Sequence, residues 1–540
     1  MNSQAIRFYH QGSLVEVNGA HPTRSVLDWL REDARCTGTK EGCNEGDCGA
    51  CTVVIGELPE HTDTGVAASA TPAASIVRGL SLRTVNACIQ FLPTLHGKAL
   101  FTVEDLKAIA GADNTATASV DAHTASDVKL HPAQRAMVEC HGSQCGFCTP
   151  GFVMSLYATY EHHQAAGSRP SRQQLADELS GNLCRCTGYR PILDAGQRMF
   201  DLPTVALDTT PVIQALQSLA SDQTFTYAAP NPQRSESRID HFHAPKSLSA
   251  LAKLREQFPK AQLLAGSTDI GLWVNKGLRD LGDILFIGDV DELKRVEQRG
   301  GELRIGAGVS LEVAWRALAA QHPDLTDVWL RFASVPIRNA GTLGGNVANG
   351  SPIGDAPPVL MSLDAQIELR KGEHTRRMPL ADFYIDYMKN HLQSGEFVQA
   401  LVVPLATPGQ KVRAYKISKR FDCDISALCA GFSIVLDSDT VKEVRLAYGG
   451  MAGIVKRAAG AEAALTGQPW SQANVASAKL ALAADFKPLS DMRASAAYRM
   501  QVAQNLLQRF WLETRVEQPL PPEATSVWSV MPHEPSLQGV

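Results

Sequence analysis

The sequence predicts a multidomain α+β protein, and three observations support this prediction. The chain has 540 residues, a length that usually corresponds to three or four domains. Ten of the 12 cysteines precede residue 190, whereas glycine-rich turns between alternating strand and helix patterns mark the second half. These changes of pattern predict domains at residues 1–95, 96–200, 236–410 and 411–520, a linker at 201–235 and an extended tail at 521–540.

Composition and charge argue against several classes of function. Hydrophobic residues make up 44% of the chain and charged residues 20%, which is enough apolar material for several buried cores. The 51 basic and 56 acidic residues give a net charge of −5, so no basic surface for nucleic acid is expected. The N-terminus lacks the features of a secretory signal, and no run of about 18 apolar residues predicts a membrane helix. We therefore expect a cytoplasmic protein, in which clustered cysteines indicate metal or redox chemistry.

The N-terminal segment predicts a small α+β sandwich. The runs AIRFYH and LVEVNG alternate apolar and polar residues around a turn at Gln11-Gly12-Ser13, a pattern typical of a β-hairpin. Residues 25–33 follow with apolar side chains at helical spacing, and residues 52–56 are typical of a buried strand. The small, polar run 60–74 predicts a surface loop.

Residues 96–200 predict a small helical bundle. The segment TPGFVMSLYATY begins at Thr149, which is a candidate helix cap. The segment SRQQLADELSGN offers a capping box between Ser171 and Gln174, with Gly181 as a C-terminal cap. Because a cysteine pair stands at one end of each helix, the bundle is expected to hold a group between them.

The first group of cysteines has a diagnostic spacing. Cys43, Cys48 and Cys51 form a C-x4-C-x2-C pattern and Cys88 follows later, as in plant-type ferredoxins, whose four thiolates hold a [2Fe–2S] cluster. Cys36 fits no part of this pattern and is interpreted as a packing residue. A structural zinc site is the less favoured alternative. Three glycines allow the loop to wrap closely around a cluster: Gly42, Gly46 and Gly49.

The second group of cysteines is less specific by spacing alone. Cys145 and Cys148 form a C-x2-C pair, and Cys184 and Cys186 form a C-x-C pair. A thioredoxin-like site needs a βαβ context, which is absent here. The spacing favours a second [2Fe–2S] cluster and leaves zinc open. Cys140 lies on the preceding helical stretch and is interpreted as a packing residue.

Two glycine-rich segments stand out in the second half of the chain. LLAGSTDIG spans residues 263–271 and GTLGGNVANGSPIGD spans residues 341–355, whereas no G-x-G-x-x-G follows a strand. Glycines in such loops let backbone N–H groups approach a pyrophosphate, although plain turns remain an alternative. Short polar side chains that can donate to phosphate oxygens are Ser267, Thr268, Thr342, Asn346 and Ser351.

The second cysteine group also carries a family resemblance. GSQCGFCTPGFVMSLYATY and GNLCRCTGYRPIL resemble the two cluster-binding segments of the molybdenum hydroxylase family, which includes xanthine dehydrogenases, aldehyde oxidases and CO dehydrogenases. The resemblance implies a plant-type ferredoxin-like domain followed by a four-helix-bundle [2Fe–2S] domain. It implies two ligand sets: Cys43, Cys48, Cys51 and Cys88 for one cluster, and Cys145, Cys148, Cys184 and Cys186 for the other.

Both glycine-rich segments are similar to the FAD-binding motifs of the same family. The resemblance implies a vanillyl-alcohol-oxidase-type FAD domain and a CO-dehydrogenase-flavoprotein-like C-terminal α+β domain. Phe332 matches an aromatic residue beside the isoalloxazine ring, Lys416 a basic residue near the flavin, and Asp424 a position on the nicotinamide side. The remaining positions carried over to FAD binding are Leu264, Ala265, Gly266, Ser267, Thr268, Asp269, Ile270, Thr342, Gly344, Gly345, Asn346, Ser351 and Asp355.

The resemblance also implies a function, because fusion of the iron–sulfur and FAD parts is typical of the xanthine dehydrogenase branch. A large molybdopterin-binding partner subunit would hydroxylate hypoxanthine and xanthine to urate, and electrons would pass through both clusters to FAD and then NAD+. No catalytic residue of the hydroxylation is expected in this chain, and a dimer of heterodimers is expected. The alternatives are an aldehyde or another N-heterocycle as substrate, O2 as acceptor, and a non-enzymatic iron–sulfur and zinc scaffold.

Overall fold

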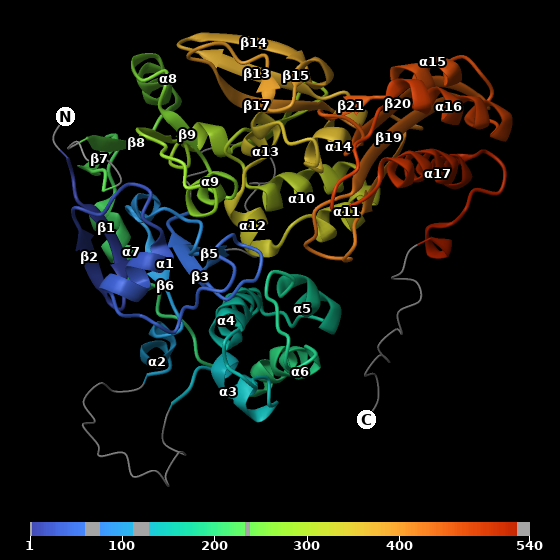
Figure 1. The fold of residues 1–540 in the computed structure, drawn as a ribbon. Coiled ribbons are helices and arrows are strands. Elements are labelled where there is room, and N and C mark those ends of the chain that lie inside the picture. The colour runs from blue at the N-terminus through green and yellow to red at the C-terminus, as the bar shows by residue number, and fades with distance from the viewer. Residues whose placement is uncertain (1–2, 60–75, 112–128, 233–237, 526–540) are drawn as a thin grey trace.

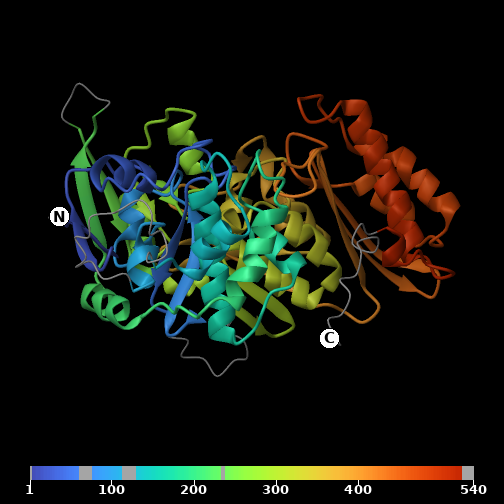
Figure 2. The same cartoon turned by 90° about the horizontal axis from the view of Figure 1, so that it is seen from below.

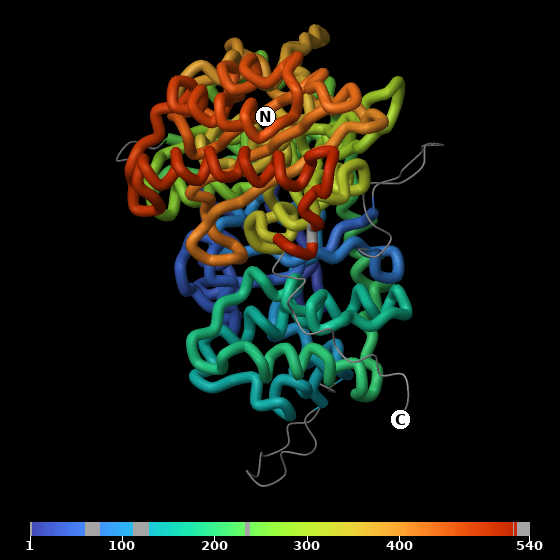
Figure 3. Tube along the Cα trace, turned by 90° about the vertical axis from the view of Figure 1, so that its right-hand side faces the viewer, coloured from blue at the N-terminus to red at the C-terminus, as the bar shows by residue number. Residues whose placement is uncertain are grey.

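The computed structural model describes residues 3–59, 76–111, 129–232 and 238–525. A sheet-based N-terminal unit, a helical bundle, a larger mixed unit and a C-terminal unit follow one another along the chain (Figure 1). Figure 2 shows the bundle in the middle, with the N-terminal and C-terminal units on opposite sides. Figures 1 and 3 agree that the bundle forms the end of the molecule farthest from strands β13 (Gln366–Lys371) and β14 (His374–Pro379). The predicted multidomain α+β class is confirmed.

The N-terminal unit is a six-stranded sheet with the strand order β2-β1-β6-β3-β5-β4. The predicted hairpin is confirmed, since β1 and β2 pair antiparallel from His10↔Ser13 to Ile6↔Val17. The predicted helix at 25–33 begins as α1 (Val26–Asp28) and continues as a π-helical turn, Trp29–Asp33. The predicted loop at 60–74 lies outside the described residues. The strands are β1 (Ile6–His10), β2 (Ser13–Val17), β3 (Thr52–Glu57), β4 (Ile76–Val77), β5 (Leu80–Asn86) and β6 (Ala99–Phe101).

The helical bundle confirms the capping box between Ser171 and Gln174 but corrects two other predicted caps. Cys148 rather than Thr149 caps α4, because the Thr149 hydroxyl donates to Ser143 Oγ at 2.7 Å. Helix α5 ends before Gly181, at the cap Leu179. The helices are α2 (Asp105–Ile109), α3 (Pro132–Glu139), α4 (Thr149–Ala166), α5 (Arg172–Glu178) and α6 (Arg190–Arg198), of which α3 to α6 pack together.

The segment 201–235, predicted to be a linker, contains regular structure. Helix α7 (Thr210–Leu219) packs on β1 and buries Val212 and Leu216 in the core that also contains α4. Strand β7 (Phe225–Pro230) pairs antiparallel with β8 (Ile239–Ala244) of the next unit. The segment therefore ties the N-terminal half to the larger mixed unit rather than only spanning the distance between them.

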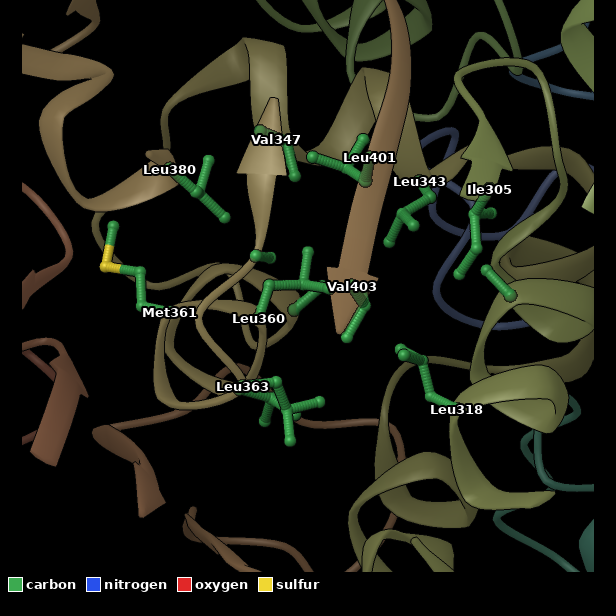
Figure 4. Close-up of a cluster of buried hydrophobic side chains, with 14 of the residues drawn as sticks. Ile305, Leu318, Leu343, Val347, Leu360, Met361, Leu363, Leu380, Leu401 and Val403 are labelled. Carbon is green, nitrogen blue, oxygen red and sulfur yellow. The ribbon is translucent and has the colours of Figure 1, made fainter. Parts of the chain in front are cut away.

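The larger mixed unit contains two main sheets, ordered β7-β8-β10-β9 and β11-β12-β17-β13-β14. Its core is apolar and includes Ile305, Leu343 and Leu401 (Figure 4). The strands not yet given are β9 (Gln262–Leu264), β10 (Ile284–Phe286), β11 (Val296–Arg299), β12 (Glu302–Gly306), β15 (Tyr384–Asp386), β16 (Lys389–Asn390) and β17 (Phe397–Pro404). The helices are α8 (Leu248–Gln257), α9 (Ile270–Asn275), α10 (Leu311–Gln321), α11 (Thr326–Arg331), α12 (Val335–Ala340), α13 (Leu343–Asn349) and α14 (Ala356–Ser362).

The C-terminal unit is an antiparallel sheet, β18-β19-β20-β21, that packs against helices. Its strands are β18 (Lys411–Ile417), β19 (Leu428–Asp437), β20 (Thr440–Gly449) and β21 (Lys456–Arg457). Its helices are α15 (Ala459–Leu465), α16 (Gln472–Asp485) and α17 (Ala496–Thr514). Most of the predicted extended tail lies outside the described residues. Within the described part of the chain, no helix is both long and apolar enough to cross a membrane.

His96 joins the N-terminal unit to strand β7 and predicts a pH dependence of stability. Its ring stacks on Phe225 with centroids 3.7 Å apart, and its Nδ1 accepts from the Arg7 backbone N–H at 3.2 Å. Burial first, and then the nearby Lys246, lowers the pKa of His96 to about 4. Because the folded-state pKa is depressed, the associated stability is present above pH ~6.5 and is lost as the pH falls towards 4.

Phenylalanine at position 96 keeps the stacking but cannot be protonated. In His96→Phe, the free energy of unfolding is therefore expected to fall by roughly 2 kcal/mol less between pH 7 and pH 4 than in the wild type. The measurement is the melting temperature of wild type and variant across this range. The matched control is His374→Phe, because His374 is exposed at the start of β14. The prediction would be contradicted if the melting temperature of His96→Phe fell with pH as steeply as that of the wild type.

Candidate cofactor sites

The first cysteine group comes together because of strand pairing. Cys51 directly precedes β3 and Cys88 follows β5, and the register Thr52↔Asn86 places the two cysteines side by side. Their thiols are in hydrogen-bonding contact, as are those of Cys43 and Cys48. The contact with Cys48 is the largest cause that lowers the pKa of Cys43, to about 5. All four predicted ligands of the first cluster therefore lie at one end of the sheet, in two pairs.

The loop around Cys43 supplies backbone donors to sulfur. The N–H groups of Asp47 and Cys48 each lie 3.3 Å from Cys43 Sγ. Gly49 has a φ of +70°, and a Cβ there would lie 2.2 Å from the Gly181 carbonyl oxygen. A side chain would therefore strain the loop and force it away from the helical bundle. The donors and the close wrapping fit a cluster with thiolate ligands, which such hydrogen bonds stabilise.

The second cysteine group lies between two helices. Cys145 and Cys148 precede α4, whereas Cys184 and Cys186 precede α6. The thiols pair as Cys145 with Cys186 and Cys148 with Cys184. In the described residues, no three His, Cys, Asp or Glu side chains surround a single metal position. Two thiol pairs per group match the number of protein ligands that a [2Fe–2S] cluster takes, two on each iron.

The two remaining N-terminal cysteines lie apart from these groups. Cys36 is buried, with its Sγ 3.7 Å from His10 Nε2. Cys140 is the cap of α3 and packs at the edge of the bundle core. Both positions agree with packing roles.

The two cysteine loops are in direct contact, a feature that the sequence did not reveal. Leu183 lies one residue before Cys184, and its backbone N–H donates to the Cys48 carbonyl at 3.0 Å. The buried Asn182 side chain donates to the Gly49 carbonyl at 3.0 Å and accepts from Ser155 Oγ at 2.6 Å. Asn182 lies two residues before Cys184 in the segment GNLCRC, and this position beside the second cysteine pair is its sequence signal.

The predicted pyrophosphate loops face each other across a gap too narrow for a side chain at Gly266. A Cβ at Gly266 would lie 1.8 Å from the Ala340 carbonyl oxygen. Ser267, next to it, has a φ of +65°. The buried Ser267 Oγ and Asn346 Oδ1 have no hydrogen-bond partner among the residues that the structure describes. Unpaired polar atoms beside such a close backbone approach fit a polar ligand, and pyrophosphate and ribityl groups offer the required partners.

Other predicted cradle residues take part in local structure. The Thr342 hydroxyl accepts from the Gly345 N–H at 3.1 Å and so caps α13. Gly344 lies against Ala307, which a Cβ would approach to 2.4 Å. Ser351 Oγ accepts from the Ile353 N–H at 3.4 Å. These contacts hold the second loop in place. The remaining predicted residues of the first loop lie between β9 and the first residue of α9, namely Ala265, Thr268, Asp269 and Ile270.

Asp355 and Lys416, predicted separately, form one buried network with Ser426. Lys416 Nζ lies 2.6 Å from Asp355 Oδ2 and 2.8 Å from Ser426 Oγ, and Ser426 donates to Asp355 Oδ1 at 2.6 Å. Asp355 caps α14 and Lys416 lies on β18, so the network joins two units. Ser426 was not predicted and has no motif of its own.

The aromatic and acidic candidates lie in different surroundings. Phe332 is buried, with its ring 5.7 Å from that of Trp315. Asp424 accepts from the backbone N–H groups of Arg420 and Ile425 at 2.9 and 3.0 Å. Leu264 is fully buried at the end of β9. Asp424 thus shapes its own loop, whereas Phe332 and Leu264 contribute to the cores on which the cradle rests.

Four protein-family descriptions match the chain in the order of its units. Residues 8–88 match a 2Fe-2S iron–sulfur cluster binding domain, and residues 119–197 match a [2Fe-2S] binding domain. Residues 235–406 match the FAD binding domain in molybdopterin dehydrogenase. Residues 413–514 match the CO dehydrogenase flavoprotein C-terminal domain.

Curated relatives agree with these matches. The chain is 30% identical to the xanthine dehydrogenase of Emericella nidulans, over 94% of this chain and 38% of that protein. It is 32% identical to the xanthine dehydrogenase of Calliphora vicina, over 82% of this chain and 34% of that protein. It is 27% identical to aldehyde oxidase 4 of Cavia porcellus, over 87% of this chain and 36% of that protein.

The chain belongs to the molybdenum hydroxylase family. It combines the [2Fe–2S] and FAD-binding domains of this family of oxidoreductases, as the resemblance of the sequence predicted. The chain spans a little over a third of the length of the relatives described above. Solved structures of the family with partial similarity include a Cu,Mo-CO dehydrogenase (25% identity, TM-score 0.48, 52% of this chain and 96% of that one). Another is quinoline 2-oxidoreductase of Pseudomonas putida 86 (22%, TM-score 0.47, 52% and 98%).

In this member of the molybdenum hydroxylase family, the segments predicted to hold cofactors contact one another in series. The second cysteine loop touches the first through Leu183 and Cys48. The first cysteine loop contacts the predicted FAD cradle through Gln90, which lies two residues after Cys88 and whose Nε2 donates to the Gly266 carbonyl at 2.9 Å. These contacts keep the three predicted cofactor sites close together and fix their relative positions.

Proposed function

We propose that this chain is the iron–sulfur/FAD electron-transfer subunit of a xanthine dehydrogenase. The observation that carries the proposal is the unbroken series of contacts from the second cysteine loop through the first to the FAD cradle. The similarity to xanthine dehydrogenases over 94% and 82% of the chain favours this branch of the family. In this proposal the chain holds the electron-carrying cofactors, and it does not supply the general base that acts on the substrate.

The proposed ligands are the two cysteine groups, with Cys43, Cys48, Cys51 and Cys88 on one cluster and Cys145, Cys148, Cys184 and Cys186 on the other. The cradle at Ala265–Asp269 and Gly344–Asn346 would hold the FAD pyrophosphate. When bound, the clusters carry single electrons and the flavin exchanges single electrons for a hydride. The protein's part is to bind these groups, exclude water from them and keep their separations constant.

We propose that a large molybdopterin-binding subunit docks beside the second cysteine group and oxidises hypoxanthine and xanthine to urate. Cys145 and Cys186 are exposed, unlike Cys51 and Cys88. Large apolar side chains are exposed on the same bundle, at 64% for Val138, 47% for Phe147 and 39% for Tyr189, as is common at protein interfaces. A dimer of such heterodimers is the proposed assembly. A cytoplasmic location agrees with the free state of all twelve cysteines.

NAD+ is the proposed electron acceptor, with O2 as the alternative. The test uses the purified chain: iron, acid-labile sulfide, flavin and the visible spectrum are measured before and after NADH is added. About four irons and one FAD per chain, with bleaching by NADH, are expected. Full cofactor content without bleaching would exclude NAD+ as the acceptor. A colourless chain that also resists reconstitution would contradict the whole proposal.

The substrate is tested separately, with the partner subunit present. Xanthine is expected to reduce the complex faster than an aldehyde or another N-heterocycle does. Faster reduction by an aldehyde would favour the second candidate, which the 27% identity to an aldehyde oxidase over 87% of the chain supports.

Single cysteine substitutions test the ligand sets. Cys48→Ser and Cys145→Ser are each expected to lower the iron content from about four to about two atoms per chain, because each removes one ligand of a different cluster. Iron and sulfide analysis with low-temperature EPR measures this loss. The matched controls are Cys36→Ser and Cys140→Ser, which are expected to keep about four irons. Equal losses in a control and a ligand variant would contradict the assignment.

A further inference from the structure

Helix α9 runs from the FAD cradle directly to the first cysteine group. It begins after Asp269, the last residue of the predicted pyrophosphate loop, and ends at Asn275. Its first turn lies against Ile89, one residue after Cys88, so closely that a Cβ at Gly271 would be 2.7 Å from the Ile89 carbonyl oxygen. Because that contact is with backbone, the helix cannot shift towards the cysteines without disturbing both sites.

The last turn of α9 makes side-chain contacts with both halves of the first cysteine group. Asn275 Nδ2 lies 2.7 Å from the Cys88 carbonyl oxygen and 3.1 Å from Asn44 Oδ1. Lys276, which follows it, places its Nζ 2.6 Å from the Cys43 carbonyl oxygen. Two consecutive residues therefore bind the carbonyl groups of Cys43 and Cys88, two predicted ligands that are 45 positions apart in the sequence.

The charge of Lys276 has limited local compensation. It forms a long ion pair with Glu45, whose Oε2 lies 3.8 Å from Nζ, and both side chains are nearly half exposed, at 48% for Lys276 and 42% for Glu45. Reduction of a [2Fe–2S] cluster adds one negative charge. A cation hydrogen-bonded to the backbone of a ligand residue stabilises that charge and raises the reduction potential.

We propose that the last turn of α9 tunes the first cluster, with Lys276 raising its reduction potential and Asn275 fixing its position relative to the FAD cradle. Both are positioning residues, since they act through the Cys43 and Cys88 carbonyl groups. The proposal rests on the ligand set proposed above. It adds that helix α9, together with the cysteine loop, sets the driving force for electron transfer between the first cluster and the flavin.

The test for Lys276 is an EPR-monitored redox titration of the full, cofactor-loaded chain. The signal of the first cluster is assigned by its loss or change in Cys48→Ser. Lys276→Met is expected to lower the midpoint potential of this cluster, shifting its electron equilibrium three- to tenfold, where tenfold equals about 59 mV. The second cluster is expected to keep its midpoint potential in this variant. In Lys276→Arg, which retains the positive charge, the first cluster is expected to have the wild-type midpoint potential. Because Lys276 is exposed, the shift should shrink at 1 M salt, where the Debye length is about 3 Å.

Two matched variants control for general effects. Lys411 Nζ also donates to a backbone carbonyl, that of Thr514 at 2.7 Å, but within the C-terminal unit, so Lys411→Met is expected to leave both potentials unchanged. Asn339 Nδ2 donates to the Thr84 carbonyl at 3.1 Å and, like Asn275, bridges the larger mixed unit and the N-terminal sheet. Asn275→Ala is expected to alter the EPR line shape of the first cluster and to speed its iron loss to a chelator several-fold. Asn339→Ala is expected to change neither.

The outcomes separate this inference from the proposed function. A chain with two normal cluster signals and the same potentials in wild type and Lys276→Met would overturn the inference and leave the proposed function intact. Equal shifts of both clusters would also overturn it, because they would indicate a long-range charge effect. Absence of cluster signals from the wild-type chain would overturn the ligand set and this inference together.

Discussion

Replacing Gly266 with alanine is expected to abolish FAD binding while both iron–sulfur sites stay intact. The added Cβ would lie 1.8 Å from the Ala340 carbonyl oxygen and 2.7 Å from the Gly341 Cα. Real Cβ atoms do not approach backbone this closely, and backbone cannot rotate away as a flexible side chain can. The loop from Gly266 to Asp269 must therefore separate from the loop that leads into α13. Separation opens the predicted cradle, in which Ser267 Oγ and Asn346 Oδ1 are buried without a hydrogen-bond partner in the described part of the chain.

The measurement is the flavin released per chain by acid, together with iron and sulfide. We expect the flavin content to fall at least tenfold and the iron content to remain at the wild-type value. The matched control is Gly453→Ala, because a Cβ there would meet only Tyr387 Cβ, at 4.0 Å. If Gly266→Ala retained stoichiometric flavin, the cradle would have to lie elsewhere. If it lost iron as well, the variant would have disturbed the first cysteine group through Gln90, which contacts the Gly266 carbonyl.

The parts of the fold that the sequence predicted well are those governed by local patterns. The hairpin around Gln11 follows from two runs that alternate apolar and polar residues around a turn, and the capping box at Ser171 follows from two side chains three residues apart. Caps that depend on competing partners were predicted less well. Thr149 has the right side chain for a cap, but its hydroxyl is bonded to Ser143, which no local rule anticipates.

The candidate sites show the same division. Cysteine spacing and glycine-rich segments identified which residues belong to each site, because ligands and close backbone approaches need those residue types. The residues that connect the sites were missed, since Asn182, Asn275 and Gln90 are ordinary polar residues whose partners at the neighbouring site are more than 130 positions away in the sequence. Their roles arise only when the β3–β5 pairing, α9 and the bundle are placed together, which is a property of tertiary structure.

The buried network of Lys416 predicts the largest single effect on stability. The side chains of Lys416 and Asp355 are 1% and 3% exposed, and their charged atoms lie 2.6 Å apart. Lys416→Met leaves the Asp355 carboxylate buried with Ser426 as its one remaining side-chain partner among the described residues. Breaking a buried ion pair on one side usually costs about 3–5 kcal/mol, and the pair joins β18 to α14 across two units. We therefore expect the calorimetric transition of this part of the molecule to fall by many degrees.

A double variant separates stability from cofactor binding. Lys416→Met combined with Asp355→Leu removes both charges, and apolar replacement of a buried ion pair is often neutral or stabilising, so most of the lost stability is expected to return. The flavin content of the double variant is expected to be low even when its stability returns, because Asp355 is a proposed FAD residue. The matched control is Arg445→Met, which removes a solvent-accessible pair with Asp364 (3.0 Å; side chains 20% and 52% exposed) that also links the two units, and its loss is expected to cost less than about 1 kcal/mol. Equal destabilisation by the control and Lys416→Met would contradict the argument from burial, and full flavin content in the double variant would remove Asp355 from the FAD site.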